Sequence, residues 1–226
     1  MKLCIDSFIL ILITLMTDER KIFMIILYIT TIVLAYLIGS FPTGYILVKA
    51  VKGIDIREVG SGSTGATNVK RVLGTKAYIF VMFVDALKGL LPVLAAKYIE
   101  VKIGFTAQLH ILPVLVAVAA IMGHSKSIFL KFTGGKSVAS GVGTILGLNP
   151  VVGLITIISW MVLTYFTKIV SISSIIVVLL TPVWMFVFKQ PLSYVIYCLI
   201  GALYIVYLHK ENIKRLLSGS ENKIRN

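Results

Sequence analysis

Hydrophobic residues are concentrated in seven runs, separated by short polar or glycine-rich segments. Most of the runs have the ~17–25 apolar residues that a membrane-spanning helix needs. They are apolar throughout, whereas the strands of a membrane barrel alternate between apolar and polar residues. The pattern therefore predicts an all-α membrane protein with about seven transmembrane helices. The runs are Met24–Val48, Ala77–Lys97, Ala107–Gly123, Val138–Leu148, Val151–Thr167, Ser171–Phe188 and Leu192–Leu208.

The fourth run, Val138–Leu148, is shorter than the others and rich in glycine. Small residues let two membrane helices approach each other closely, so this run is compatible with a tightly packed span. A re-entrant segment that does not cross the membrane is the alternative, and the sequence leaves both open.

Lysine and arginine gather in three regions, at residues 49–76, 126–136 and 210–225. If seven helices alternate, all three regions fall on one side of the membrane, and the loops of the opposite side have only Lys97, Lys102 and Lys189. Because cytoplasmic loops collect Lys and Arg, this predicts an outside N-terminus and an inside C-terminus. Residues 1–23 end in charges after an apolar run too short to span, so they are read as an extension before a single membrane-embedded domain, 24–226.

Composition supports the membrane assignment: 58% of the 226 residues are hydrophobic and 14% are charged. The net charge of +13 would suggest a nucleic-acid partner in a soluble protein. Here cytoplasmic loops explain it, and a basic site also attracts phosphorylated substrates, so no nucleic acid is expected. Cys4 and Cys198 lack metal-ligand spacing, so no metal site is predicted.

Residues 55–71 form the first polar segment, DIREVGSGSTGATNVKR. Its glycines let the backbone bend and come close to a ligand, and successive N–H groups in such a turn bind anions. The segment is not a Walker loop. A flexible solvated loop is the alternative, but the continuation into a helix ending in Lys-Arg favours phosphate binding. The candidate residues are Gly60, Ser61, Gly62, Ser63, Gly65, Thr67, Asn68 and Arg71.

The second polar segment spans residues 124–143 and places a glycine pair just before a short predicted helix. A helix N-terminus that follows glycine favours anion binding, and Lys136 would add a positive charge there. Lys126 is read as a topology-setting residue instead. For His124, a hydrogen bond at the helix end and a role in substrate binding are both open. The candidate residues are Gly134, Gly135, Lys136 and Ser140.

The basic tail and one apolar run carry the remaining polar candidates. His209 and Asn212 are three apart and would share a helix face, with Glu211 and Arg215 as a second pair. Taken alone, the tail reads as a Lys- and Arg-rich interfacial cap. Asp85 and Lys88 lie inside a predicted span, where charges are costly and are functional candidates. An ion pair between these two residues is the alternative.

Read together, five segments resemble the bacterial glycerol-3-phosphate acyltransferases that use acyl phosphate as donor. The segments are residues 39–49, 55–74, 83–89, 123–143 and 209–222, in the same order and spacing. The resemblance implies a seven-helix enzyme of the bacterial inner (cytoplasmic) membrane, with its active site facing the cytoplasm. It also implies transfer of a fatty acyl group from acyl phosphate to the 1-hydroxyl of glycerol 3-phosphate, giving lysophosphatidic acid and inorganic phosphate. It implies no cofactor, membrane lipid as a partner, and nothing about the oligomeric state.

The resemblance also assigns candidate catalytic and substrate-binding residues by position: Ser61, Arg71, Lys136, His209 and Asn212. It therefore assigns His209 and Asn212 a role in the site, in place of the interpretation of the tail as an interfacial helix cap. The chain departs from the usual family pattern, with Ser63 in place of Asn. Thr133, Ser137 and Ser140 stand where Lys, Gly and Thr are usual, so a positive charge near the anionic donor is lost.

Two other functions remain open at this point. Glycine-rich broken helices and buried charges also mark transporters, so a small-anion transporter is one alternative. A catalytically weakened paralogue that binds lipid precursors is another. Against the transporter, the polar motifs lie at one face and no inverted repeat is visible. The general base is also open between His209 and the phosphate of glycerol 3-phosphate.

Overall fold

A computed structural model describes residues 19–103 and 110–224, and within them the chain folds into α-helices joined by short loops. Two short 3-10 helices, η1 (Ile56–Glu58) and η2 (Ile128–Leu130), lie in the two polar segments. The α-helices are α2 (Glu19–Ser40), α3 (Thr43–Lys52), α4 (Ala66–Leu73), α5 (Thr75–Ile103), α6 (Ile111–Ser125), α7 (Val138–Leu148), α8 (Pro150–Thr167), α9 (Val170–Val187), α10 (Leu192–Leu208) and α11 (Lys210–Leu217).

The predicted apolar runs correspond closely to helices, with one correction. α7 and α10 have the predicted bounds, and α5 continues beyond the predicted end at Lys97. The first run was predicted as one helix but is divided at Phe41 and Pro42 into α2 and α3. Proline lacks an N–H and disfavours helical geometry in the residue before it, which explains the break. The predicted start of the third run, residue 107, lies outside the described residues.

Several helices are long and apolar enough to cross a membrane. Among the described residues these are the segments Ile22–Lys52, Thr75–Lys102, Pro150–Thr167 and Val170–Val187. α10 and α11, bent by 61° at their junction, make a fifth candidate. α6 and α7 are only about 22 and 16 Å long at 1.5 Å per residue, against ~30 Å of hydrocarbon. The count of seven spans therefore stays a prediction.

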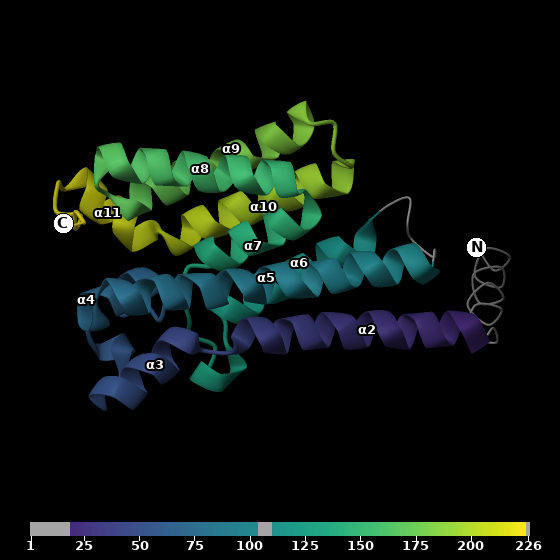
Figure 1. Cartoon of the computed structure of the whole chain (residues 1–226), viewed down its shortest axis with the longest axis horizontal. Coiled ribbons are helices and arrows are strands. Elements are labelled where there is room, and N and C mark those ends of the chain that lie inside the picture. Colours follow the sequence, from purple (N-terminus) through teal and green to yellow (C-terminus); the bar gives the residue numbers. More distant parts are fainter. Residues whose placement is uncertain (1–18, 104–109, 225–226) are drawn as a thin grey trace, which may run out of the picture.

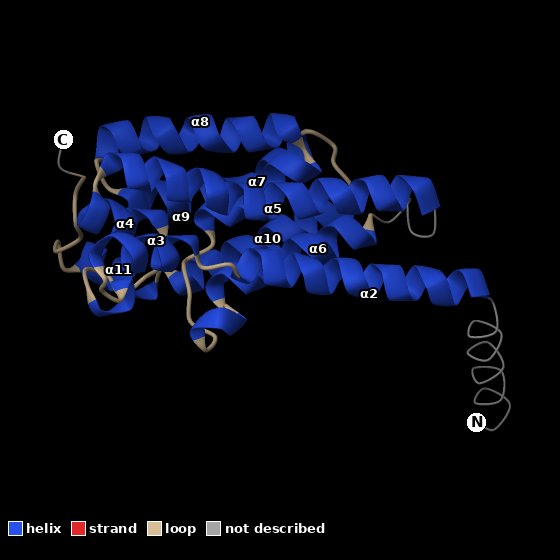
Figure 2. Cartoon of the chain, turned by 60° about the horizontal axis from the view of Figure 1, so that its bottom comes forward, coloured by secondary structure: helices blue, strands red, loops and turns tan. Residues whose placement is uncertain are grey.

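The helices form a bundle, with most of the long helices running side by side (Figure 1). α2 lies along one side of the bundle and packs on α6, while α8 lies on the opposite side, and both views agree on this (Figure 2). The short helices α3, α4 and α11 gather at the same end, although α11 is far from the other two in sequence. This arrangement brings the first glycine-rich loop and the basic tail to one end of the molecule.

Small residues let α7 pack closely on α5, while the choice between a span and a re-entrant segment stays open. A Cβ atom at Gly143 would overlap the carbonyl of Ala86, and one at Gly89 would overlap the carbonyl of Ser140. At the far end of this contact, Lys97 donates to the last carbonyls of α7, at 3.2 Å from Gly147 O. The contact fixes α7, and therefore the loop before it, against the longest helix.

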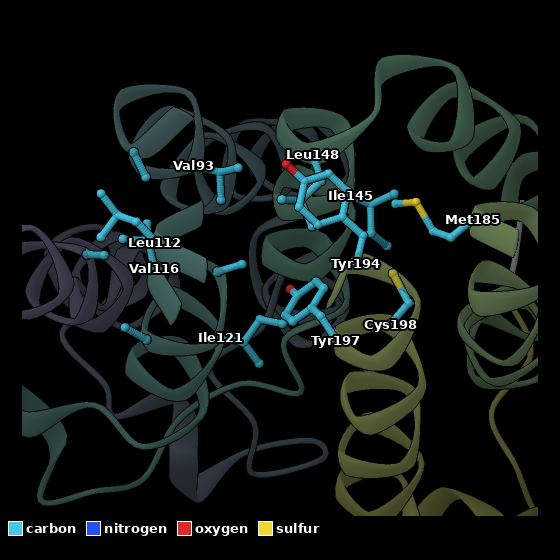
Figure 3. Packing of buried hydrophobic residues seen from close by; sticks show 14 of the residues in the cluster. Val93, Leu112, Val116, Ile121, Ile145, Leu148, Met185, Tyr194, Tyr197 and Cys198 are labelled. Carbon is cyan, nitrogen blue, oxygen red and sulfur yellow. The ribbon is translucent and has the colours of Figure 1, made fainter. Parts of the chain in front are cut away.

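The main apolar core lies between α5, α6, α7, α9 and α10 (Figure 3). Val93, Leu112 and Met185 are fully buried within it. Inside it, the Tyr197 and Thr144 hydroxyls share a hydrogen bond of 2.5 Å, so each buried hydroxyl has a partner. A smaller cluster lies under the first glycine-rich loop, where α3, η1, α4 and α5 contribute Val48, Ile56, Val69 and Val81. This second cluster fixes α4 and the loop before it.

Candidate functional site

Asn68 holds the first glycine-rich loop closed. Its side chain is buried, and its amide nitrogen donates to the carbonyls of Ile56, Val59 and Ser63 at 3.2, 3.0 and 2.9 Å. Its amide oxygen accepts from the N–H of Ser61 at 3.1 Å. Both ends of this side chain are committed to the backbone. Asn68, predicted to bind phosphate, is therefore corrected to a residue that shapes the loop.

Two of the predicted loop glycines have the backbone geometry that favours glycine. Gly60 and Gly62 have φ of 62° and 68°, in the left-handed region. A Cβ atom at Gly60 would also overlap Asn68 Oδ1, so glycine is needed at this position to leave room for the Asn68 side chain as well. Gly65 has an ordinary negative φ, and its N–H donates to Ser63 Oγ at 3.2 Å. The prediction that these glycines bend the loop is confirmed at two of three positions.

The donors that stay available in this segment are at its surface. Ser61 and Arg71 are exposed, and Thr67 lies half-buried in the first turn of α4. Within the described part of the chain, no hydrogen bond or ion pair engages the Arg71 guanidinium. Its charge nevertheless lowers the pKa of Lys136. The first loop therefore presents a cation toward the second polar segment.

The glycine pair before α7 is explained by packing on α6. A Cβ atom at Gly135 would overlap the ring of His124, and one at Gly134 would overlap the His124 carbonyl. The Gly135 N–H donates to that same carbonyl at 3.1 Å. Gly134 and Gly135 were predicted to line a phosphate site. That role stays a prediction, and the structure shows that both glycines give the close fit that places Lys136.

Ser140 was also predicted in a phosphate loop, and the structure places it elsewhere. It lies in the first turn of α7, is fully buried, and packs with its carbonyl against Gly89 of α5. Its Oγ is buried and has no hydrogen-bond partner among the described residues, so its role in the phosphate loop stays a prediction. Ser137, the residue before α7, donates its hydroxyl to the carbonyl of Ile121 at 2.9 Å. The Ser137 hydroxyl therefore helps to fix the start of α7 against α6.

Lys136 reaches across to the tail and hydrogen-bonds the side-chain oxygen of Asn212. The pKa of Lys136 is lowered from 10.5 to about 8, mainly by burial and also by the charges of Arg215 and Arg71, while Glu221 opposes them. Three cations from three segments therefore face the same small region. Bringing them together is unfavourable unless an anion joins them, which is what a phosphate-binding site requires.

His209 and Asn212 share a buried face of the tail, as their spacing predicted. Their exposed fractions are 4% and 6%. His209 Nδ1 lies 2.8 Å from the carbonyl of Ile205, so the ring is protonated at Nδ1 and Nε2 carries the lone pair. Burial lowers the pKa of His209 to about 4, the bond to Ile205 opposes this, and Lys136 adds to it. The imidazole is therefore neutral near pH 7.

Glu221, which the sequence reasoning missed, binds this group together. It accepts from Asn212 at 2.7 Å, from Arg215 at 2.7 Å and from Ser171 at 3.0 Å. Burial raises the pKa of Glu221, but these hydrogen bonds outweigh burial and hold it below its usual range. The predicted pairing of Arg215 with Glu211 is wrong, since Glu211 pairs with Lys214 instead. The sequence feature that could have pointed to Glu221 is an acidic residue set apart from other acids in a basic tail.

A contact also joins the two glycine-rich segments directly. Arg57, which is paired with Asp55 at 2.6 Å, reaches Thr133 Oγ1 at 3.5 Å. Hydrogen bonds from Arg57 hold the pKa of Asp55 below its usual range. Thr133, one of the departures from the expected family pattern, therefore lies beside a guanidinium that a lysine at this position would repel.

The family model for glycerol-3-phosphate acyltransferases matches residues 29–219, which is most of the chain. This chain belongs to the glycerol-3-phosphate acyltransferase family. Curated members from Trichormus variabilis and Rippkaea orientalis are each 48% identical to it, covering 85% of this chain and 90% and 91% of theirs. It is therefore an acyltransferase, and its apolar helices place it with the integral membrane enzymes of the family.

Solved structures of this acyltransferase family share the fold. The chain resembles PlsY, an integral membrane glycerol 3-phosphate acyltransferase, in its glycerol 3-phosphate form with a TM-score of 0.81 and 35% identity. That match covers 88% of this chain and 96% of PlsY. The lysophosphatidic acid form of PlsY gives a TM-score of 0.78 at 34% identity. The site described above is thus part of an acyltransferase fold.

Proposed function

We propose that this acyltransferase transfers a fatty acyl group from acyl phosphate to the 1-hydroxyl of glycerol 3-phosphate, giving lysophosphatidic acid and inorganic phosphate. The observation that supports it most is the convergence of Lys136, Asn212 and His209, with the charge of Arg71 nearby. These groups come from three distant segments and form a buried, cationic and hydrogen-bonding site. The glycerol 3-phosphate and lysophosphatidic acid named for the similar PlsY structures each carry a phosphate that such a site would bind.

The proposed reaction needs two phosphorylated molecules side by side. Lys136 and Arg71 offset their mutual repulsion, and holding both substrates converts a bimolecular step into a unimolecular one. The 1-hydroxyl oxygen attacks the acyl carbonyl carbon, the bond from that carbon to the phosphate oxygen breaks, and phosphate leaves with the electron pair. The exposed Ser61 hydroxyl or a neighbouring N–H would stabilise the developing oxyanion, a contribution of typically ~2.7–4 kcal/mol per donor.

The proton of the attacking hydroxyl has two candidate acceptors. His209 presents the unprotonated Nε2, but a pKa of about 4 makes it a weak base in the free enzyme. A bound phosphate would raise that pKa because negative charge favours the imidazolium form. The phosphate of glycerol 3-phosphate is the other acceptor. Substrate binding therefore strengthens His209 as a base, which favours it in the ternary complex.

We further propose a multi-pass protein of the bacterial inner membrane with seven spans, its N-terminus outside and its C-terminus inside. The single domain would comprise residues 24–226, although α2 already begins at Glu19. The gathering of α3, α4 and α11 with their lysines at one end supports a cytoplasmic site there. A cysteine introduced at Lys210 should react with a membrane-impermeant thiol reagent only in opened vesicles, and one at Lys189 should react in intact cells.

The activity is tested with purified protein, acyl phosphate and glycerol 3-phosphate. Release of inorganic phosphate matched by lysophosphatidic acid is expected, with loss in Lys136→Met and no change in Lys131→Met, an exposed lysine of the same segment. Absence of release together with solute flux in proteoliposomes would support the transporter instead. A weakened paralogue would gain activity when Ser63→Asn and Thr133→Lys are introduced together.

A further inference from the structure

A buried ion pair on α5 lies outside the residues given substrate roles above. Asp85 and Lys88 are 2% and 5% exposed, and their charged atoms are 2.6 Å apart. Removing two charges from water costs several kcal/mol per ion, and apolar replacements of such pairs are often equally stable. Stability alone is therefore a weak explanation for this pair, and its contacts suggest another.

Lys88 is connected to the first glycine-rich loop. Its Nζ donates to the carbonyl of Phe41 at 2.5 Å, at the break between α2 and α3. This bond fixes the point from which α3 starts. α3 in turn packs on the loop without space for a side chain, since a Cβ atom at Gly44 would overlap the carbonyl of Thr64. The ammonium of Lys88 is therefore linked to residues 60–65 through the start of α3.

Asp85 is connected to the second segment through His124. Its Oδ1 lies 3.9 Å from His124 Nδ1, and the His124 side chain is 8% exposed. The other edge of the His124 ring lies against Gly135, whose N–H bonds the His124 carbonyl. Lys136 is the next residue. A shift of the His124 ring would therefore move the backbone that carries Lys136.

The space between these two contacts is a small polar cavity that reaches both loops. It is lined by Thr64 of the first loop and Gly134 of the second, as well as by the ion pair itself. Two further lining hydroxyls, Ser40 Oγ and Thr43 Oγ1, are buried and lack a protein partner among the described residues. Unsatisfied buried hydroxyls cost stability, so this cluster is not arranged for stability alone.

We propose that Asp85 and Lys88 are a pair of positioning residues for the acyl transfer. Lys88 sets the first glycine-rich loop through Phe41, and Asp85 sets Lys136 through His124. The pair thereby fixes the distance between the two loops, and with it the spacing of the two bound substrates. This inference rests on the proposed function, because the spacing matters only if each loop region holds part of a substrate.

A neutral replacement separates positioning from stability. The double variant Asp85→Leu with Lys88→Met removes both charges, so it should unfold within a few degrees of the wild-type protein in detergent. We expect kcat for phosphate release to fall at least about tenfold even though the protein is folded. A second double variant, Asp85→Asn with Lys88→Gln, keeps a donor toward the Phe41 carbonyl at position 88 and an acceptor oxygen toward His124 at position 85. It should recover much of that loss.

The matched control is Lys97→Met on the same helix. Lys97 also donates to backbone carbonyls across the α5–α7 contact, but about 13 Å further along α5. It should lower the unfolding temperature without changing kcat per folded molecule. Wild-type kcat in the apolar double variant, or no recovery in the amide variant, would overturn the positioning role. A wild-type protein that releases no phosphate would instead overturn the proposed function.

Discussion

Raising the pH through about 8 should remove the proton of Lys136 and, with it, the binding of phosphate. The shift of its pKa from 10.5 to about 8 corresponds to about 3 kcal/mol against the charged form. At pH 7 about nine-tenths of the molecules still carry the charge, and at pH 9 about one-tenth do. The value of kcat/KM for glycerol 3-phosphate should therefore fall about tenfold between pH 7 and pH 9.

The direction in which activity changes with pH follows from the protonation state that each group must have for the reaction. Lys136 is needed charged and its pKa is lowered, so activity is present below about pH 8 and is lost above it. His209 is needed neutral and its pKa is lowered to about 4, so its protonation costs nothing until the pH approaches 4. The second ionisation of a phosphate monoester lies near pH 6, so protonation of the substrate should also lower activity at acid pH. This acid limb of the pH profile belongs to the substrate. That limb should persist in Lys136→Arg.

The assay measures phosphate release in buffers of constant ionic strength from pH 5 to pH 10. Arginine remains protonated throughout, so the Lys136→Arg variant should lose the basic limb whatever its absolute rate. Lys131→Arg changes an exposed lysine five positions earlier and should leave the limb where it is. A wild-type profile that is flat to pH 10, or a limb near 8 that survives in Lys136→Arg, would refute the electrostatic argument.

Three further variants test the geometry of the site. His209→Gln should lower kcat by about 100-fold or more with little change in KM if Nε2 takes the proton, and a rise in KM alone would show a binding role. Glu221→Gln removes the negative charge and replaces one of the two acceptor oxygens by an amide donor, which should cost about 1.5–3 kcal/mol of unfolding free energy, whereas the exposed Glu211→Gln should cost nothing measurable. Asn68→Ala should release the first glycine-rich loop and raise KM about tenfold or more, while Asn222→Ala should leave KM unchanged. Equal KM values for the two variants would contradict the role of Asn68 in holding the loop closed.

The helices could be predicted from hydrophobicity because a continuous apolar run has few alternatives to a buried helix. This is why α7 and α10 coincide with predicted runs to the residue. The same reasoning failed at Phe41, where the apolar run continues but the helix does not. Pro42 was the available signal, and it was outweighed by the length of the run.

The site was harder to predict because one residue type serves two purposes. A polar side chain in a glycine-rich segment looks the same whether its partner is a ligand or a carbonyl of its own loop. Asn68 binds the backbone, and Gly135 makes room for His124. These partners are set by packing between segments far apart in the chain. The sequence pattern therefore located the site but did not show which of its residues face a ligand and which hold the protein backbone in place.

The charge balance around Glu221 shows how a cationic site can hold its parts in place before substrate arrives. Unpaired, Lys136 and Arg215 would repel each other, and Asn212 would have no fixed orientation. Glu221 pairs with Arg215 and orients Asn212, whose oxygen then binds Lys136. One buried acid thus neutralises one cation and leaves the charges of Lys136 and Arg71 for phosphate. An acid placed to face the substrate would repel it, whereas behind Asn212 it strengthens the site.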